Sequence, residues 1–485
     1  MPDRPKNVII LSSDEMRGDC PGYMGNPDCE TPNLDRFAER TVAFRQHYTV
    51  FPKCVPARIA MMTGRYCHTD GFRTIYQHLP NDQPDVLATL KRHGYETALF
   101  GLNHCWENVY GEDHNAPGSA YVDYHSFTKD YFPHLLEKEW PVPEPGPDAV
   151  EEFSLPGDTD YGKRITEPLT FFCDDNRARQ AVHYLTEVRD RSRPFFMQLN
   201  LSRPHPSYMA PEPFFSMYDR EAIAPWPYEL PENAPLPLRE MRRIRTGHDV
   251  PERAFRELQA VYYAMVTKVD DVLGPVLDAI TQEGLWEDSV VLFWVDHGDF
   301  AGQYGLPEKW DTCMADCLTH VPFMLWDPDL PEGHTVDSLS DHTDVAPTIL
   351  ELLGVEPDWG IHGHSLLPAV EGRPVRRAVF ADGGHEEEMW SRFEFSEGGS
   401  GKQRTYLECP EAMARTKMVR TDRHKLVMRL VGGNEFYDMR EDPYELRNLW
   451  GQPEVHETVC DLQERMIEWC LRTDTDRPYQ DEVRA

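Results

Sequence analysis

Residues 51–65 read FPKCVPARIAMMTGR, and the fold that we expect is organised around this stretch. Prolines break the loop on either side of Cys54, and the run from Arg58 to Met62 is typical of the first turns of a helix. A cysteine there faces the positive end of the helix dipole, which favours a thiolate or an oxyanion made from it. The plainer interpretation is a structural cysteine, because free cysteine is among the most buried residue types.

Other apolar runs are typical of buried strands, and each is followed at once by polar residues. The runs and the residues after them are 7–11 with SSDEMR, 95–100 with GLNHCW, 195–201 with SRPHP, and 289–295 with DHGD. Open α/β sheets place their chemistry at the carboxyl ends of their strands. We therefore expect the functional site where these four polar segments meet.

The alternation of strands and helices predicts an α/β fold. We expect a large, mixed and mostly parallel central sheet, flanked by helices at residues 84–93, 176–189 and 252–282. The organisation changes near Gly372, where a smaller antiparallel sheet begins, with strands at 378–381, 418–420 and 425–430 and a terminal helix after it. The expected units are a catalytic domain at 1–371 and a smaller C-terminal subdomain at 372–485.

Composition narrows the classes of partner. The formal charge of −34 argues against nucleic acid and against anionic membrane surfaces as partners, so a site for an anion would have to be locally positive. The first apolar run, residues 7–11, is far too short for a signal peptide or a membrane span. Eleven cysteines without CxxC spacing fit reduced thiols. These features together predict a cytoplasmic protein.

Several motifs share one resemblance. CVPAR at 54–58 followed by TGR at 63–65 resembles the signature of the type I sulfatases, in the alkaline phosphatase superfamily. TPNLD at 31–35, DHGD at 296–299 and REDPYELRNL at 440–449 are similar to further motifs of that family, in the same order over nearly the whole chain. The resemblance implies a sulfatase-like fold and the oxidation of Cys54 to formylglycine by a formylglycine-generating enzyme.

The strand ends also predict a metal site. Adjacent carboxylates such as Asp14 and Glu15 repel each other unless a cation lies between them, and Asp296 with His297 is a usual pair of ligands for a divalent ion. We expect these four residues around one cation, with Cys54 as a further ligand. Hard oxygen ligands suit Ca²⁺, Mg²⁺ or Mn²⁺, and the resemblance favours Ca²⁺. Relatives often carry Asp-Asp or Asp-Gln at the first pair, so Glu15 departs from the family pattern.

The resemblance assigns catalytic roles to Arg58, His104, His205 and Lys309. Arg58 would hold the hydrated formylglycine, while Lys309 and His104 would neutralise the oxygens of the sulfate. His205, which two prolines hold in place, or Lys309 would protonate the departing alcohol.

One residue departs from the family pattern in this part of the site. Sulfatases usually carry Gly-Lys-x-His where this chain has Leu102 in the lysine position. One positive contact is therefore either missing or supplied elsewhere, with Arg73 as a candidate substitute. A monoanionic sulfate ester needs less positive charge than a dianionic phosphate ester. The missing lysine therefore favours a sulfate ester as substrate.

The implied reaction is the hydrolysis of an organic sulfate monoester, either an aryl sulfate or a sulfated carbohydrate. One oxygen of the hydrated aldehyde attacks sulfur, and the second hydroxyl then expels sulfate. The alternatives are a phosphonate or phosphate ester hydrolase of the same superfamily, and an anion-binding protein or vestigial sulfatase with an unmodified Cys54. The loops at 106–170 and 203–251 would set the choice of alcohol, with the arginines between 239 and 245 in a solvated basic loop. The sequence leaves open whether the protein forms a homo-oligomer.

Overall fold

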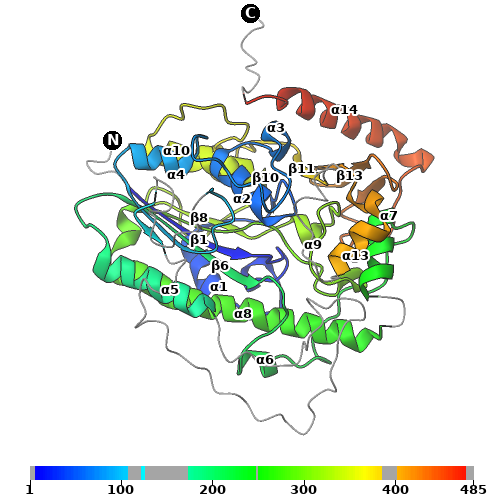
Figure 1. Ribbon diagram of the computed structural model, residues 1–485, viewed down its shortest axis with the longest axis horizontal. Helices are drawn as coiled ribbons and strands as arrows, with labels where there is room; N and C mark the ends of the chain where they lie inside the picture. The colour runs from blue at the N-terminus through cyan, green and yellow to red at the C-terminus, as the bar shows by residue number, and fades with distance from the viewer. Residues whose placement is uncertain (1–5, 108–121, 126–172, 247–249, 385–400, 477–485) are drawn as a thin grey trace, which may run out of the picture.

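An eight-stranded sheet forms the centre of the molecule (Figure 1). The computed structural model describes residues 6–107, 122–125, 173–246, 250–384 and 401–476. All strands of this sheet run parallel except β8, which is antiparallel to both of its neighbours, β7 and β2. In spatial order the strands are β5 (Tyr124–His125), β4 (Glu96–Gly101), β6 (Phe195–Pro204), β1 (Asn7–Asp14), β7 (Ser289–Val295), β8 (Phe323–Trp326), β2 (Val42–Phe44) and β9 (His334–Val336). The predicted mixed, mostly parallel sheet is confirmed.

Strand β1 lies in the interior of this sheet and is buried on both faces. Ile9 and Leu11 pack into one apolar cluster, while Val8 and Ile10 pack into another on the opposite face. This explains why residues 7–11 are continuously apolar, since a strand covered on both sides has no polar face. The strand runs three residues further than predicted and ends at Asp14, because β6 and β7 continue to pair with it on either side.

Helices cover both faces of the sheet (Figure 1). One cluster includes apolar residues of α1, α5 and α8, and the other includes apolar residues of α2, α4 and α10. The predicted helix 252–282 is confirmed with the same bounds and continues through Pro275. The helices are α1 (Pro32–Arg40), α2 (Cys54–Thr63), α3 (Cys67–Asp70), α4 (Val86–Arg92), α5 (Cys173–His183), α6 (Phe214–Met217), α7 (Leu236–Met241), α8 (Glu252–Gln282), α9 (Asp316–Thr319), α10 (Val345–Leu353), α11 (Leu367–Val370), α13 (Gly401–Glu408) and α14 (His456–Arg472).

A second, antiparallel sheet forms the C-terminal part of the chain. Its strands are β11 (Val379–Gly383), β12 (Thr416–Arg420), β13 (His424–Arg429) and β14 (Glu435–Asp438), and α14 packs against it. The first three strands and the helix are confirmed, whereas β14 was not predicted. Phe436 of β14 shares a core with Trp469 of α14 and with Phe51 of the loop before α2. The division of the chain at residue 371 stays a prediction.

The prediction of a solvated basic loop at 239–245 is wrong for two of its arginines. Arg242 and Arg245 are buried, both in the helical turn Arg242–Thr246 that follows α7. Arg245 is fully enclosed because its guanidinium forms an ion pair with Glu308, at 2.8 Å from Nη2 to Oε2. Most of the predicted insertion loops at 106–170 lie outside the described residues.

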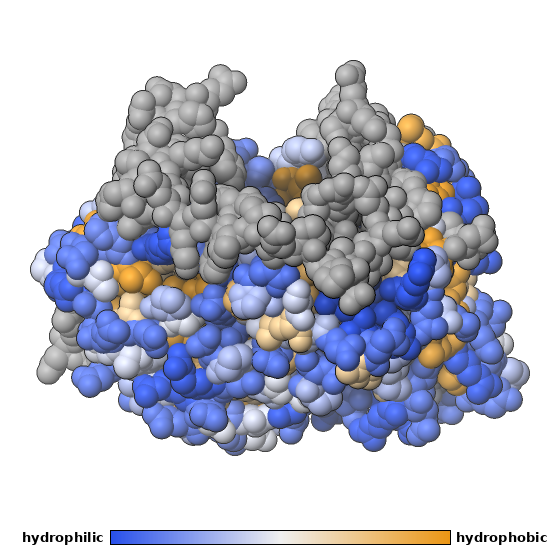
Figure 2. Space-filling view, turned by 90° about the horizontal axis from the view of Figure 1, so that it is seen from below, coloured by the Kyte–Doolittle hydropathy of each residue, from blue (hydrophilic) through white to orange (hydrophobic). Residues whose placement is uncertain are grey.

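The face on the side of α6 and α8 is largely hydrophilic, with hydrophobic residues in small separate groups (Figure 2). This agrees with an acidic chain that has 83 Asp and Glu residues against 49 Lys and Arg. Within the described residues, none of the helices combines the length and the apolar character that a transmembrane span requires. A short pair of strands, β3 (His47–Tyr48) and β10 (Ser340–Asp341), completes the described sheets.

The end of β4 gives a test of the close approach between β4 and β6. Gly101 has φ +87°, and a Cβ on it would lie 1.8 Å from the backbone oxygen of Asn200. Gly101→Ala should therefore destabilise the protein by about 2–5 kcal/mol, combining overpacking with a left-handed backbone. Gly94→Ala is the matched control, since Gly94 has φ +84° and no atom within 4 Å. The urea midpoint of unfolding should be highest for wild type, lower for Gly94→Ala and lowest for Gly101→Ala. Equal midpoints for the two variants would contradict the close approach.

Candidate active site

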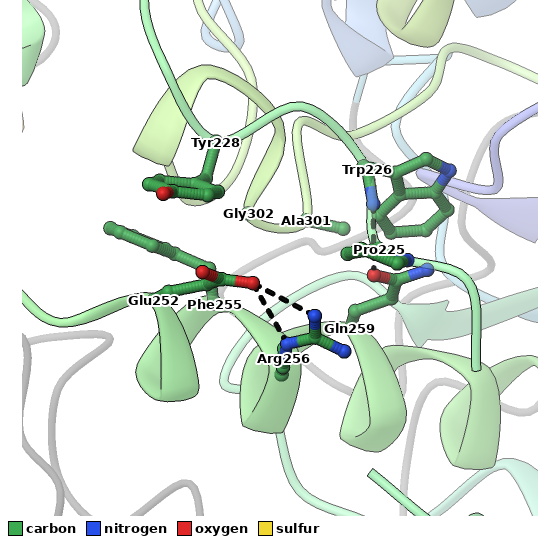
Figure 3. A pocket seen from close by; sticks show the side chains of 9 residues that line it. All are labelled: Pro225, Trp226, Tyr228, Glu252, Phe255, Arg256, Gln259, Ala301 and Gly302. Carbon is green, nitrogen blue, oxygen red and sulfur yellow. Dashed lines mark hydrogen bonds and ion pairs between the residues drawn. The ribbon is translucent and has the colours of Figure 1, made fainter. Parts of the chain in front are cut away.

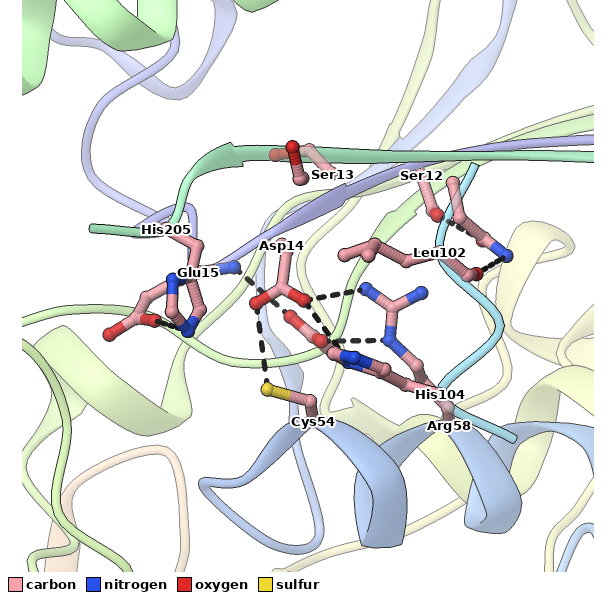
Figure 4. A network of polar contacts seen from close by, with 12 residues as sticks. Ser12, Ser13, Asp14, Glu15, Cys54, Arg58, Leu102, His104 and His205 are labelled. Atoms are coloured by element: carbon pink, nitrogen blue, oxygen red, sulfur yellow. Dashed lines mark hydrogen bonds and ion pairs between the residues drawn. The ribbon is translucent and has the colours of Figure 1, made fainter. Parts of the chain in front are cut away.

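Two acidic residues from neighbouring strands form the centre of the site, and one of them, Asp14, is labelled in Figure 4. Asp14 ends β1, and Asp296 directly follows the end of β7, which pairs in parallel with β1 up to Ser13. Both side chains are fully buried, and the backbone N–H of Glu15 donates to Oδ1 of Asp296 at 3.1 Å. Burial and the charge of Asp296 raise the pKa of Asp14 to about 7. Two carboxylates so placed need a positive partner.

Arg58 is the first such partner. Its Nε donates to Oδ2 of Asp296 at 2.9 Å, and its Nη2 donates to Oδ2 of Asp14 at 3.2 Å. Burial opposes ionisation of Asp296, but the charge of Arg58 lowers the pKa of Asp296 below its usual range. Arg58 therefore bridges the two carboxylates from the first turns of α2.

Cys54 is the first residue of α2 and lies against the same carboxylates. Its Sγ is 3.6 Å from Oδ1 of Asp14 and 3.3 Å from Nε2 of His297. The predicted helix is confirmed, but it begins at Cys54 itself, four residues earlier than the predicted first turns at Arg58–Met62. Pro56 is accepted there because the first turn does not need its N–H. Burial first, and then the charge of Asp14, raise the pKa of the Cys54 thiol well above its usual value. The helix dipole, which would favour a thiolate, is outweighed at this position.

The donor atoms fit a divalent cation. Ligand atoms of Asp14, Cys54, Asp296 and His297 all lie within 4.8 Å of one another. Nδ1 of His297 lies 3.0 Å from the backbone oxygen of Gly298, an arrangement that leaves Nε2 facing the carboxylates, as is usual for a metal-binding histidine. Burial lowers the pKa of His297 to about 3, so its imidazole is neutral. Buried carboxylates and a neutral imidazole are a donor set for Ca²⁺, Mg²⁺ or Mn²⁺.

Glu15 pairs with Lys309, whereas the sequence predicts it beside the cation. Its Oε2 accepts a hydrogen bond from Nζ of Lys309 at 2.7 Å and lies 3.5 Å from Nε2 of His205. In Figure 4 its carboxylate points toward His205 and away from Cys54. Glu15 forms a second group of ligand atoms with Asp14 and His205, which shares Asp14 with the group of four that contains Cys54. Its role as a metal ligand stays a prediction.

Lys309 is the second positive partner of the site. Its side chain is almost fully buried, with Nζ 2.7 Å from Oε2 of Glu15 and 3.6 Å from Oε1 of Glu308. Burial acts to lower the pKa of Lys309, but Cys54, Glu15 and Glu308 together raise it well above its usual value. Lys309 is therefore a permanent cation beside the nucleophile position.

Several residues that hold these groups in place were not found from the sequence. Glu308, with φ +57°, lies between Lys309 and the buried Arg245. Lys53, just before Cys54, forms an ion pair with Asp311 at 2.5 Å and so joins the start of α2 to the loop of Lys309. Charged residues in loops are usually solvated, and no local pattern marks these as buried.

His104 and His205 lie on the open side of the site. Their side chains are 32% and 30% exposed, whereas Asp14 and Glu15 are fully buried. Nδ1 of His104 is 3.8 Å from Oδ2 of Asp14 and has no hydrogen-bond partner among the described residues. Burial lowers the pKa of His104 to about 3. The two histidines therefore border the side from which a substrate would enter.

Leu102 lies on the same side as His104, after the end of β4. Figure 4 shows its side chain pointing from β4 toward Asp14. Arg73, predicted as a substitute for the missing lysine, instead donates through Nη1 to the backbone oxygen of Gly384 at 3.1 Å and lies 3.9 Å from Asp382. The guanidinium of Arg73 thus has its partners at and after β11, and these contacts do not support a role as the substitute.

A small cavity beside the loop after Asp299 is unsuited to a substrate (Figure 3). Its volume is about 10 Å³, room for about one water molecule. The two charged side chains that line it, Glu252 and Arg256, pair with each other at 2.8 Å.

Comparisons with known proteins agree with this geometry. The Sulfatase family model matches residues 6–355. The chain is 28% identical to the multifunctional alkaline phosphatase superfamily protein PehA of Trinickia caryophylli, over 96% of this chain and 95% of that protein. It is 24% identical to an arylsulfatase of Clostridium perfringens, over 95% of this chain and 93% of that protein. The solved structure of a phosphonate monoester hydrolase from Silicibacter pomeroyi shares its fold, with a TM-score of 0.77, 23% identity, and coverage of 97% of this chain and 96% of that one.

The family model covers well over half of the chain, and the matched part includes every candidate site residue, from Asp14 to Lys309. The chain therefore belongs to the sulfatase family, within the alkaline phosphatase superfamily, and is an enzyme of the sulfuric ester hydrolase class.

Proposed function

We propose that the protein hydrolyses an organic sulfate monoester, either an aryl sulfate or a sulfated carbohydrate, to the alcohol and inorganic sulfate. The observation that carries this proposal is the convergence of Asp14, Cys54, Asp296 and His297 within 4.8 Å, with the buried cation Lys309 beside them. This arrangement makes the site locally positive once a cation is bound, although the chain as a whole carries a charge of −34.

A divalent cation would be held by Asp14, Asp296, His297 and the side chain at position 54. Such an ion would supply positive charge to the oxygens of the bound ester. Ca²⁺ is the ion that the family resemblance favours, and Mg²⁺ or Mn²⁺ would use the same oxygen donors. The fully buried carboxylates support the proposal, because buried charges are paired or bind metals.

The nucleophile would be an oxygen of hydrated formylglycine at position 54, made by a formylglycine-generating enzyme. The raised pKa of the Cys54 thiol supports this, because it leaves little thiolate at neutral pH. Arg58 fixes the position of the two carboxylates around residue 54 through its bonds to Asp14 and Asp296.

Three further side chains would act on the ester. Lys309 would attract the anionic group, because its surroundings keep it protonated. His205 is partly exposed at the end of β6, where it can pass a proton to the departing alcohol. His104, on the opposite side, would donate a hydrogen bond to a sulfate oxygen.

The alternative within the superfamily is hydrolysis of a phosphonate or phosphate ester. Relatives with both kinds of name, arylsulfatase and phosphonate monoester hydrolase, resemble this chain. A phosphate monoester carries two charges and needs more cations than a sulfate monoester, and Leu102 stands where a lysine would supply one. The charges of the site therefore favour esters with a single negative charge. Membership of an enzyme family argues against a mere anion-binding protein.

Modification of Cys54 is the first point to test. In protein made together with a formylglycine-generating enzyme, the peptide that contains Cys54 should be lighter by about 18 Da than its thiol form. Cys54→Ala should abolish sulfate ester hydrolysis and leave the thermal midpoint of unfolding unchanged within about 2 °C, since it removes one sulfur atom. Cys67→Ala, which alters another buried cysteine, is the control and should stay active. Hydrolysis by a protein whose Cys54 remains a thiol would contradict the mechanism.

Lys309→Gln tests the buried cation. Losing this charge should lower kcat/KM for a sulfate ester by about 10²–10³-fold, as for other groups that stabilise developing charge. Lys91→Gln, which removes a lysine from α4, should keep kcat/KM within about twofold of wild type. If Lys309→Gln behaved like Lys91→Gln, Lys309 would have no part in the reaction.

Metal binding can be measured without turnover. Protein freed of metal by a chelator should bind one Ca²⁺ per chain in calorimetry and gain thermal stability, because the folded state alone presents the assembled ligands. His297→Ala should weaken that binding at least about tenfold. Asp329→Asn, which changes a carboxylate that is 83% exposed, should bind Ca²⁺ like wild type. Equal affinity of His297→Ala and wild type would exclude this histidine as a ligand.

A further inference from the structure

Arg73 is a buried cation that its described neighbours satisfy only in part. The residue is 5% exposed. Within the described part of the chain, its guanidinium makes one hydrogen bond, from Nη1 to the backbone oxygen of Gly384 at 3.1 Å, and one ionic contact, from Nη2 to Oδ1 of Asp382 at 3.9 Å. The second contact is longer than a hydrogen bond, which joins nitrogen and oxygen at about 2.7–3.2 Å. Nη2 therefore keeps donors for a further partner.

The carboxylate of Asp382 already has two nearer partners. Nζ of Lys417 lies 2.6 Å from its Oδ1, and Nδ1 of His68 lies 2.6 Å from its Oδ2. Burial acts to raise the pKa of Asp382, but His68, Lys417 and Arg73 together lower it below its usual range. Lys417 and Arg73 thus bring two positive charges to one carboxylate. One of these charges is left for another anion.

This group of charges lies close to the nucleophile position. The N–H of Asp382 donates to the backbone oxygen of Val50 at 2.8 Å, and Val50 precedes Cys54 by four residues, which span at most about 14 Å. Helix α3, which carries His68, is joined to the same place, since Sγ of Cys67 donates to the backbone oxygen of Pro56 at 3.3 Å. The group therefore packs beside the first turn of α2.

The loop after Arg73 leads to the open side of the active site. The N–H of Arg73 donates to Oε1 of Gln77 at 2.8 Å, which closes a turn. Two residues later, the N–H of Leu79 donates to the backbone oxygen of Cys105 at 2.7 Å, next to His104. The six residues from Arg73 to Leu79 span at most about 22 Å, and less when they turn. Arg73 is thus connected to the side of the site that His104 borders.

A guanidinium and an ammonium that share one carboxylate are suited to a second oxyanion. Arginine binds carboxylate and sulfate groups through parallel N–H donors. The side chain of Lys417 is 29% exposed, so solutes can reach this group of charges from solvent. The reacting sulfate would lie at Cys54 and Lys309, so an oxyanion at Arg73 would belong to another part of the same substrate.

We infer that Arg73 and Lys417 form a second anion subsite, which receives a carboxylate or sulfate group on the alcohol half of the substrate. This inference rests on the proposed function, because the subsite would select among sulfate esters that are cleaved at position 54. It goes further by naming a property of the alcohol, namely a negative charge apart from the reacting sulfate. Sulfated sugars with an acidic substituent have this property, whereas simple aryl sulfates lack it.

The test uses phenyl sulfates with para chains of increasing length that end in a carboxylate, and a matched series that ends in the carboxamide. At the length that reaches the subsite, the holoenzyme with formylglycine and Ca²⁺ should show a kcat/KM at least about tenfold higher for the carboxylate than for the carboxamide. Arg73→Gln should bring this ratio to within about twofold of unity, because it removes the cation that has unfilled donors. A series that ends in a sulfonate shows which of the two oxyanions fits better.

Three further variants make the comparison secure. Arg423→Gln is the matched control, since Arg423 is 51% exposed in the turn between β12 and β13, and it should keep the wild-type ratio within about twofold. Arg73→Lys retains the charge and should retain part of the preference for the carboxylate. Lys417→Gln should lower the ratio at least about threefold, and it tests the subsite if Arg73→Gln does not fold.

A binding measurement separates this inference from the proposed function. In the Cys54→Ala background with Ca²⁺, calorimetry gives the dissociation constants of the carboxylate and carboxamide esters. The carboxylate should bind at least about tenfold more tightly, and Arg73→Gln should remove this difference. Loss of all turnover in protein whose Cys54 is fully modified would refute the proposed function, while the binding ratio would still decide whether the subsite exists. The inference is overturned if wild type prefers neither oxyanion at any chain length, or if Arg73→Gln and Lys417→Gln both keep the wild-type ratio.

Discussion

The site depends on one interaction, in which the guanidinium of Arg58 bridges two fully buried carboxylates. Asp14 and Asp296 are adjacent because β1 and β7 pair in parallel up to the residue before Asp14. Such a pair is unfavourable in a dry interior unless cations face it. Arg58 supplies one, at 2.9 and 3.2 Å, and so fixes where α2 begins. Cys54, about one turn earlier on the same helix, is thereby placed against Asp14 and His297.

A series of buried ion pairs holds a cation at the site, although the protein as a whole is strongly acidic. Glu15, Lys309, Glu308 and Arg245 follow one another as buried partners. Buried charges lose their hydration, so each must be paired to be tolerated. The hydroxyl of Tyr208 bonds to Asp299 and accepts from the N–H of Glu308, which anchors the loop that carries Lys309. The net charge of −34 thus describes the surface, while the buried pairs set the local charge of the site.

Much of the fold could be predicted because its signals are local. Residues 7–11 and 289–295 are uninterrupted apolar runs, which a strand covered on both faces requires, and the apolar periodicity of α8 predicts its bounds. By contrast, β14 was missed because its four residues, EFYD, alternate too briefly to be distinguished from a turn. It becomes a strand through its pairing with β13 and its packing beneath α14.

The sequence by itself determined the strand ends that carry Asp14, Asp296 and His297, since parallel strands bring such ends to one edge of a sheet. It also determined the helix at Arg58–Met62 and the family motifs. Only the tertiary structure decided which charges meet. It turned Glu15 toward Lys309, enclosed Arg245 on Glu308 and drew Arg73 to Asp382. The reason is physical: a buried charge takes the nearest opposite charge in space, and that partner lies many residues away, where no local pattern can reveal it.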